Sequence, residues 1–258
     1  MPHAAILTAG ALFAVALSSG VTAAADSALP AYIAAAVADS ARPATDTERD
    51  AQRKPGATLA FSGIKPGDVV VELAPGKGYY TRLLSAAVGP QGKVIAIASP
   101  PRPDAPADAP PPAAAVQAIA ADPHYANVTV SVQRVAQLQL PEGVAADLVW
   151  TSQNYHDFHN IPDVDVVNID KAVFRTLKPG GIFLVLDHVA QAGSGFRDTS
   201  TLHRIDPDAV KKEVESAGFK YLGESNILQN KADPHTAKVF DPAIRGHTDQ
   251  FILKFRKP

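Results

Sequence analysis

The sequence predicts an α/β fold, with a mostly parallel sheet that carries helices on both faces. Apolar segments of strand length alternate with segments of helical periodicity, which is typical of parallel strands joined by crossover helices. One strand segment, residues 69–73, is almost continuously apolar, as expected for a strand buried on both faces. The chain has 258 residues, 46% of them hydrophobic, and is therefore long enough to form one such domain around a sizeable core.

The first 25 residues have the features of a secretory signal peptide. Residues 4–17 form an apolar run that only Thr8 and Gly10 interrupt, and residues 23–25 are the small alanines that signal peptidase needs. We expect cleavage after Ala25 and a periplasmic or secreted protein. The apolar run is short for a membrane span of ~20 residues, so the mature chain is expected to have no stable span. Retention of the segment as an anchor is the alternative.

Residues 26–64 are predicted to form a helical extension ahead of a domain over residues 65–258. An Ala-rich helix is expected over residues 30–38. Thr45 and Glu48 have the spacing of a capping box, which predicts a second helix that ends before Pro55. The charged face of this second helix, which includes Arg49 and Arg53, is expected to face solvent.

Seven strands are predicted in the domain, and turn residues separate them from the helices. Lys-Pro-Gly-Asp at residues 65–68 precedes the first strand, and Gly-Pro-Gln-Gly at 89–92 precedes the second. Leu83 and Leu84 lie on one side of an expected helix, and Asp206 has the position of an N-cap. The strands span residues 69–73, 94–98, 128–132, 146–150, 182–186, 219–223 and 251–255. The helices span residues 79–88, 113–121, 166–177 and 207–217, with a proline-rich loop at 100–112.

Composition narrows the range of partners. Lys and Arg number 24 against 26 Asp and Glu, a formal net charge of −2, whereas nucleic-acid binders normally carry a basic excess. The absence of cysteine excludes a thiol nucleophile, a disulfide framework and a cysteine zinc site. The composition therefore indicates no RNA or DNA partner, and no pattern indicates an oligomeric state.

A glycine-rich turn follows the first predicted strand and opens a helix. It reads Glu-Leu-Ala-Pro-Gly-Lys-Gly over residues 72–78, and its glycines let the backbone approach a ligand closely. The turn lacks the third glycine of the dinucleotide-binding pattern and the Gly-Lys-Ser/Thr of a P-loop. Its acidic residue followed by small-x-Gly-x-Gly resembles motif I of class I S-adenosylmethionine-dependent methyltransferases. Residues 146–149 and 177–181 resemble the segments around strands four and five of the same superfamily.

More narrowly, residues 75–81, 154–157 and 202–206 together resemble a group of exported bacterial predicted methyltransferases without an assigned substrate. The resemblance covers about residues 65–255. It implies a Rossmann-like class I methyltransferase fold with a seven-stranded sheet, S-adenosyl-L-methionine as the cofactor, and methyl transfer as the activity. By the same resemblance the cofactor-binding residues are Glu72, Ala74, Gly76, Gly78, Tyr79, Ser99 and Asn154. The second strand departs from the family because it ends at Ser99 without the acidic residue that binds the ribose hydroxyls.

Histidines and aspartates gather after the predicted strands. Because the carboxyl ends of parallel strands share one edge of the sheet, these groups are expected to converge. The candidate catalytic residues are His156, Asp157, His188, His203 and Arg204. In this interpretation His156 or His188 is a general base, since histidine titrates near neutral pH. Asp157 or Asp187 orients the base, and Arg204 binds an anionic group of the substrate.

The expected function is methyl transfer to a small molecule, and two alternatives stay open. One is an exported protein that binds a small ligand on a retained methyltransferase fold without methyl transfer, which the missing acidic residue favours. The other is a purely structural role, which the polar strand ends disfavour. No metal site is predicted because no H-E-x-x-H spacing occurs. The side chains of His156, Asp157, His188 and His203 are nevertheless of types that suit zinc or iron.

Overall fold

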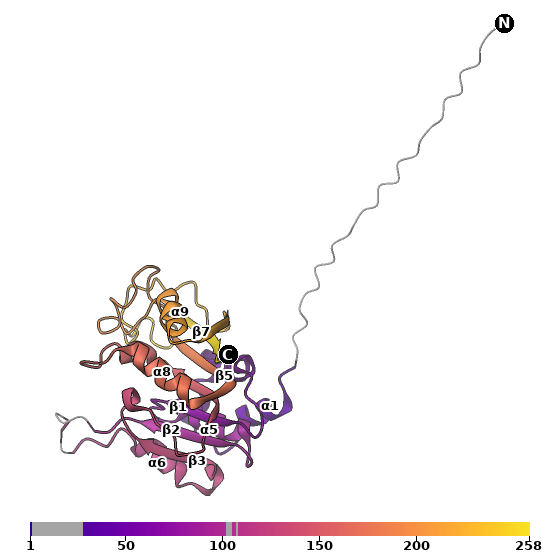
Figure 1. Cartoon of the computed structure of the whole chain (residues 1–258), viewed down its shortest axis with the longest axis vertical. Coiled ribbons are helices and arrows are strands. Elements are labelled where there is room, and N and C mark those ends of the chain that lie inside the picture. The colour runs from indigo at the N-terminus through magenta and orange to yellow at the C-terminus, as the bar shows by residue number, and fades with distance from the viewer. Residues whose placement is uncertain (2–27, 102–104, 107) are drawn as a thin grey trace.

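The computed structural model describes residue 1 and residues 28–101, 105–106 and 108–258 (Figure 1). The predicted signal peptide, apart from Met1, lies outside these residues, so its cleavage and the export of the chain stay predictions. No helix in the described part combines the length and the apolar character that a membrane crossing needs.

A seven-stranded, mostly parallel sheet forms the centre of the protein, as predicted. Its strand order is β3-β2-β1-β4-β5-β7-β6, which runs in Figure 1 from β3 at the bottom to β7 near the top. Strand β7 is antiparallel to both of its neighbours, and the other pairs are parallel. The strands are β1 (Val69–Leu73), β2 (Lys93–Ala98), β3 (Val128–Val132), β4 (Ala146–Ser152), β5 (Leu177–His188), β6 (Lys220–Ser225) and β7 (Gln250–Arg256).

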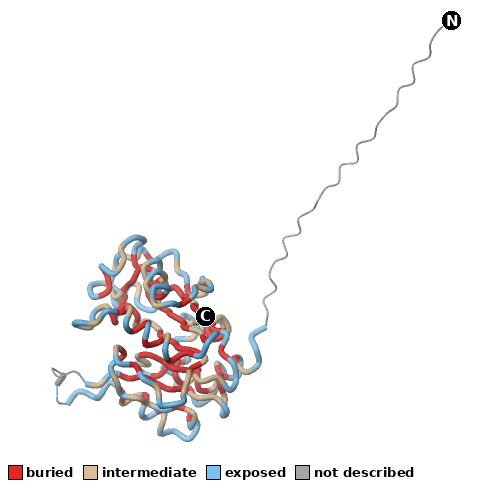
Figure 2. The backbone as a smooth tube through the Cα atoms, viewed as in Figure 1, coloured by how far each residue is buried: buried red, intermediate tan, exposed pale blue. Residues whose placement is uncertain are grey.

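Helices cover both faces of this sheet. Side chains alternate along each strand, so that Val70 of β1 belongs to one apolar cluster and Val71 to the other. Helices α1, α4, α5 and α6 contribute to the first cluster, and α8 and α9 to the second. Figure 2 shows the buried residues concentrated in the strands and in the helices that pack on them. The helices are α1 (Ala31–Val37), α2 (Ala44–Thr47), α3 (Asp50–Arg53), α4 (Pro55–Ser62), α5 (Tyr79–Val88), α6 (Ala114–Ala120), α7 (Tyr155–Phe158), α8 (Val166–Thr176) and α9 (Pro207–Ser216), with short 3-10 turns at Pro123–Tyr125 and Val135–Gln137.

The N-terminal extension differs from its prediction. The capping box is wrong, because the side chain of Thr45 makes no cap and the single expected helix is divided into α2 and α3. Lys54, with φ of 42°, ends α3 in the left-handed region, and Pro55 then opens α4, which the sequence pattern did not predict. Leu59 of α4 is fully buried, so the extension packs into the same core as the domain.

The remaining elements follow the predicted bounds closely, with two exceptions at strand ends. Strand β5 begins at Leu177 and includes the Lys-Pro-Gly-Gly segment that was expected only to stop the preceding helix. After β4 the chain forms the one-turn helix α7, which the sequence pattern did not predict. This turn carries His156 and Asp157, so it fixes the backbone of two candidate site residues.

The predicted N-cap of α9 is confirmed. The carboxylate of Asp206 accepts hydrogen bonds from the backbone N–H of Asp208 at 2.9 Å and of Gly193 at 2.8 Å. We expect Asp206→Ala to lower the free energy of unfolding by about 1–2 kcal/mol, because both donors lose their partner. Chemical denaturation measures this loss. The control Asp208→Ala removes an exposed carboxylate and should cost less than about 0.5 kcal/mol; an equal loss in the two variants would contradict the cap.

Candidate functional site

The turns that follow β1 and β4 lie side by side at the carboxyl edge of the sheet. Strands β1 and β4 pair in parallel, with Leu73 opposite Thr151. The side-chain amide of Asn154 donates a hydrogen bond of 2.9 Å to the carbonyl of Ala74, and this bond ties the two turns together. Ala74 and Gln153 both have positive φ, at 49° and 60°. Non-glycine residues in this region are strained, and such strain is concentrated at functional sites.

A pocket of about 180 Å³ opens between these turns. This is less than the roughly 300 Å³ that small-molecule sites usually reach, so it accommodates a group the size of an amino acid. Five predicted cofactor residues line it, together with the N-terminal extension. The lining residues are Arg49, Arg53, Glu72, Leu73, Ala74, Pro75, Gly76, Lys77, Tyr79, Tyr80, Ser152, Gln153 and Asn154.

Two predicted cofactor residues do not line the pocket. Ser99 is exposed at the end of β2 and is absent from the lining. Gly78 has φ of 80°, and a Cβ there would lie 2.1 Å from Cδ1 of Ile119. Gly78 therefore serves the close packing of the turn against α6. At Gly76, by contrast, φ is 58° and a Cβ would meet nothing within 4 Å, so this glycine borders open space.

Two arginines of the extension also line the pocket, although the sequence pattern predicted a solvated face for them. The guanidinium of Arg53 donates to the side-chain oxygen of Gln153 at 2.6 Å and lies 4.5 Å from the ring centroid of Tyr79. Arg49 lies over the same ring at 5.7 Å. The tyrosine hydroxyl in turn donates to Asp50 at 2.7 Å. The charged segment at residues 48–53 therefore packs against the turn after β1. Its local sequence does not distinguish it from a surface helix.

Glu72 contributes a buried carboxylate with no cation paired to it among the described residues. Its side chain accepts a hydrogen bond of 2.5 Å from the hydroxyl of Thr81. Burial raises the pKa of Glu72 to about 7, although the Thr81 bond favours the charged form. Nearby, the buried hydroxyl of Ser152 has no hydrogen-bond partner in the described structure. A ligand with donor groups satisfies both.

A second group of side chains lies at the ends of β4 and β5. His156 is only 3% exposed, and its Nδ1 lies 2.8 Å from Oδ1 of the fully buried Asp187. The backbone N–H of His156 donates to the other oxygen of Asp187 at 2.8 Å. The predicted orienting contact from Asp187 to His156 is therefore present. It fixes the ring and leaves Nε2 to face away from Asp187.

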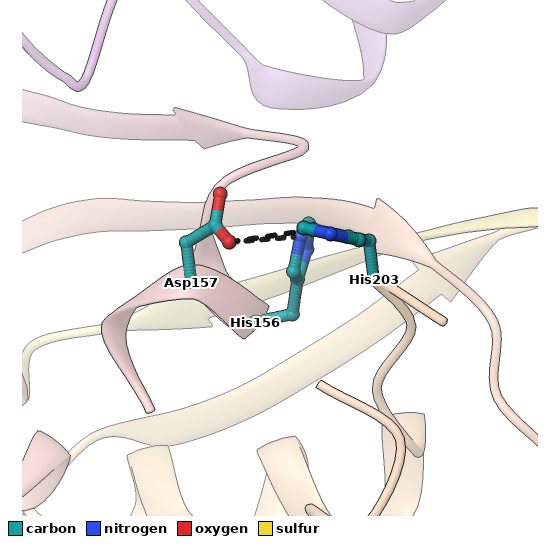
Figure 3. A group of neighbouring side chains, drawn as sticks. All are labelled: His156, Asp157 and His203. Carbon is teal, nitrogen blue, oxygen red and sulfur yellow. Dashed lines mark ion pairs between the residues drawn. The ribbon is translucent and has the colours of Figure 1, made fainter. Parts of the chain in front are cut away.

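His203 and Asp157 complete this group (Figure 3). His156 Nε2 lies 3.3 Å from Asp157 Oδ1, and His203 Nδ1 lies 3.6 Å from the same oxygen. The two rings meet edge to face, with centroids 5.4 Å apart. His203 also has a strained backbone, with φ of 55°. We call His156, Asp157 and His203 the histidine cluster.

The electrostatic environment does not favour the two histidines that were predicted as bases. Burial lowers the pKa of His156, but the charges of Asp187 and Asp157 outweigh it and raise the pKa to about 10, so His156 is protonated at neutral pH. Burial lowers the pKa of His188 to about 4, and its Nδ1 pairs with the hydroxyl of Thr248 at 2.8 Å. Neither value lies near neutral pH, where a general base is most effective.

The predicted role of Arg204 in anion binding is wrong. Its side chain is fully buried, and its NH1 lies 2.9 Å from a carboxylate oxygen of Asp233. NH1 also donates to the carbonyl of Val189 and Nε to that of Ala237, each at 2.9 Å, and NH2 donates to Asp233 at 3.0 Å. Because each nitrogen of the guanidinium has a partner and the side chain is fully buried, Arg204 holds the loops that follow β5 and β6 together and does not face a substrate.

The larger cavity in the described structure lies away from these residues. It has a volume of about 910 Å³ and is bordered by Val69 and Lys93, which begin β1 and β2. It therefore lies at the amino edge of the sheet, whereas ligands of such folds bind at the carboxyl edge. The smaller pocket is the candidate site.

Comparison with known proteins agrees with this fold. No family model matches the chain. A ubiquinone/menaquinone biosynthesis C-methyltransferase, UbiE of Hydrogenovibrio crunogenus, is 29% identical over 213 residues, which cover 76% of this chain and 66% of the relative. The chain thus matches just under two thirds of that relative's length.

Two solved structures share the architecture. A methyltransferase of Aquifex aeolicus, described as SAM dependent, aligns with a TM-score of 0.59 at 18% identity, over 82% of this chain and 93% of that one. An S-adenosylmethionine-dependent methyltransferase of Mesorhizobium loti aligns with a TM-score of 0.55 at 15% identity, over 81% and 99%. The chain has the Rossmann-like class I methyltransferase fold.

The raised pKa of Glu72 makes stability depend on pH. The folded chain holds this proton up to pH about 7, whereas the unfolded chain releases it near 4.5, so stability falls as pH rises between these values. We expect Glu72→Gln to be more stable than the wild type above pH 7, by on the order of 3 kcal/mol. Thermal and chemical unfolding at pH 5 and pH 8 measure the difference. A constant difference between the two pH values would contradict the assigned pKa.

Proposed function

We propose that the chain is an S-adenosyl-L-methionine-dependent methyltransferase that acts on a small molecule. The observation that carries this proposal is the small pocket at the carboxyl edge between β1 and β4, which presents one carboxylate and two arginines. In doubly wound sheets this edge, at the reversal of strand order, is where ligands bind. The superfamily resemblance at the turn that borders the pocket supports the same ligand.

The charges of the pocket fit the methionine part of the cofactor. An ionised Glu72 attracts the ammonium and sulfonium charges, and Arg49 and Arg53 attract the carboxylate. The open space beside Gly76 lets the cofactor approach the backbone closely. The hydroxyl of Ser152, which has no partner in the described structure, supplies one further hydrogen bond. When bound, the cofactor supplies the methyl group that is transferred. The protein residues named here hold and orient its amino-acid end.

We propose that the acceptor meets the histidine cluster. His203 is the accessible histidine of that group, with 24% of its side chain exposed, and the exposed Asp157 lies beside it. Transfer to oxygen or nitrogen requires that the acceptor lose a proton, which these side chains assist. The name of the relative mentioned above refers to quinone biosynthesis, so phenols and hydroquinones belong in a first substrate screen.

We also propose that the chain acts outside the cytoplasm, on the basis of its first 25 residues alone.

The alternative of a ligand-binding protein without methyl transfer has no specific support in the pocket. Replacement of the strand-two acidic residue by Ser99 weakens ribose binding in either case. A direct test of cofactor binding therefore comes first.

Calorimetric titration with S-adenosylmethionine and S-adenosylhomocysteine tests the pocket. We expect saturable binding to the wild type and loss of binding in Gly76→Val, because the new side chain enters the open space beside the turn. Gly143→Val is the matched control: Gly143 also has positive φ and an unobstructed Cβ direction, but it lies in a remote loop. No binding of either compound at millimolar concentration would contradict the proposal.

Substitution in the histidine cluster tests the acceptor side. We expect His203→Ala to lower turnover about 10²- to 10⁴-fold, the range for loss of proton-transfer assistance, with unchanged affinity for S-adenosylmethionine. The control His124→Ala removes an exposed histidine paired with Asp39, and full turnover is expected. Steady-state kinetics with the best acceptor of the screen provides the measurement. A parallel loss of cofactor affinity in His203→Ala would assign that residue to cofactor binding instead.

A further inference from the structure

We propose that the histidine cluster binds one divalent transition-metal ion, through His156 Nε2, Asp157 Oδ1 and His203 Nδ1. This site goes beyond the proposed methyl transfer and does not depend on it. Among the described residues these three form a group whose candidate ligand atoms all lie within 4.8 Å of one another.

The distances between the three atoms suit a shared ion. Zinc binds imidazole nitrogen and carboxylate oxygen at about 2.0–2.2 Å, which separates two ligand atoms by roughly 3–3.5 Å. The observed separations from Asp157 Oδ1 are 3.3 Å to His156 and 3.6 Å to His203. Figure 3 shows both imidazoles and the carboxylate directed toward one another. All three ligand atoms lie within 4.8 Å of one another, so side-chain rotation must contract the cluster to hold an ion at bonding distance.

A carboxylate behind one ligand supports the same conclusion. Histidines that bind metals usually donate their second ring N–H to a carboxylate, which fixes the ring and the tautomer. Asp187 provides this contact to His156 at Nδ1, and it also accepts the backbone N–H of the same residue. Because Asp187 is fully buried, the ring of His156 is held in one orientation with Nε2 directed at the cluster.

The ligand set defines the chemical class of the ion. Two imidazoles and one carboxylate are the set found in non-haem iron and in zinc sites, and they suit first-row transition metals better than Mg²⁺ or Ca²⁺. Half of the Asp157 side chain and a quarter of His203 are exposed. The site thus keeps coordination positions open to a further ligand, as catalytic metal sites do.

Other pairs of histidine and carboxylate in the chain lack this composition. His235 contacts Asp249 at 2.9 Å, and His124 contacts Asp39 at 2.8 Å. In neither pair does a second imidazole join the carboxylate within the described structure. A simple ion pair accounts for those contacts, whereas it gives no reason for His203 to be held beside His156.

Titration of the chelator-treated chain with Zn²⁺, without S-adenosylmethionine or acceptor, tests the site. We expect one ion per chain by calorimetry. Asp157→Asn and His203→Gln should each weaken Zn²⁺ binding at least about tenfold, because each removes a ligand. Asp187→Asn should weaken it about 10- to 100-fold through loss of the orienting contact. Mg²⁺ should not compete for the site.

His235→Gln is the matched control, because it removes a histidine that is paired with one carboxylate. The Zn²⁺ affinity of this variant should equal that of the wild type. Because the side chain of Asp157 is half exposed, we expect Asp157→Asn to fold as the wild type does, and its melting temperature without metal checks this. Zn²⁺-induced shifts of the His156 and His203 imidazole proton signals provide a second readout. Absence of saturable binding, or wild-type affinity in both ligand variants, would overturn the site. Neither result bears on the S-adenosylmethionine titration, so failure of this site and failure of the proposed function are distinguishable.

Discussion

The parallel pairing of β1 with β4 is the constraint on which the candidate site depends. Strand order reverses at this pair, so the chain leaves β1 and β4 toward opposite faces and opens a crevice between the two turns. The bond from Asn154 to the carbonyl of Ala74 holds the crevice at a fixed width. Positive φ at Ala74 and Gln153 is maintained because the surrounding ladder leaves these residues no relaxed alternative.

The N-terminal extension completes this crevice, because the domain alone has no cation at the pocket except Lys77. Tyr79 is the anchor: Arg42, Arg49 and Arg53 surround its ring, and its hydroxyl bonds to Asp50. These contacts place Arg49 and Arg53 in the lining of the same pocket as Glu72. The N-terminal extension and the domain therefore form the pocket together, from segments that are close in space but separated along the chain.

Two buried carboxylates at the same edge of the sheet have different surroundings. Glu72 meets only a hydroxyl, so burial dominates and its pKa rises to about 7. Asp187 meets the ring and the backbone of His156, and its charge helps to raise the pKa of that histidine to about 10. The first arrangement leaves a carboxylate available to a cationic ligand. The second uses the carboxylate to fix an imidazole whose Nε2 carries a proton at neutral pH, so a metal ion binds His156 by displacing that proton.

The sequence by itself determined the strand and helix pattern of the domain, the turn after β1 and the N-cap Asp206, because hydrophobic periodicity and turn chemistry are local properties. It also indicated that His156, Asp157 and His203 lie at one edge of the sheet. Only the tertiary structure decided that Arg204 forms a buried ion pair with Asp233, that Arg53 lines the pocket, and that Gly78 packs against α6. These outcomes depend on contacts between residues far apart in the chain. The local sequence around a charged residue does not determine which distant side chain it contacts.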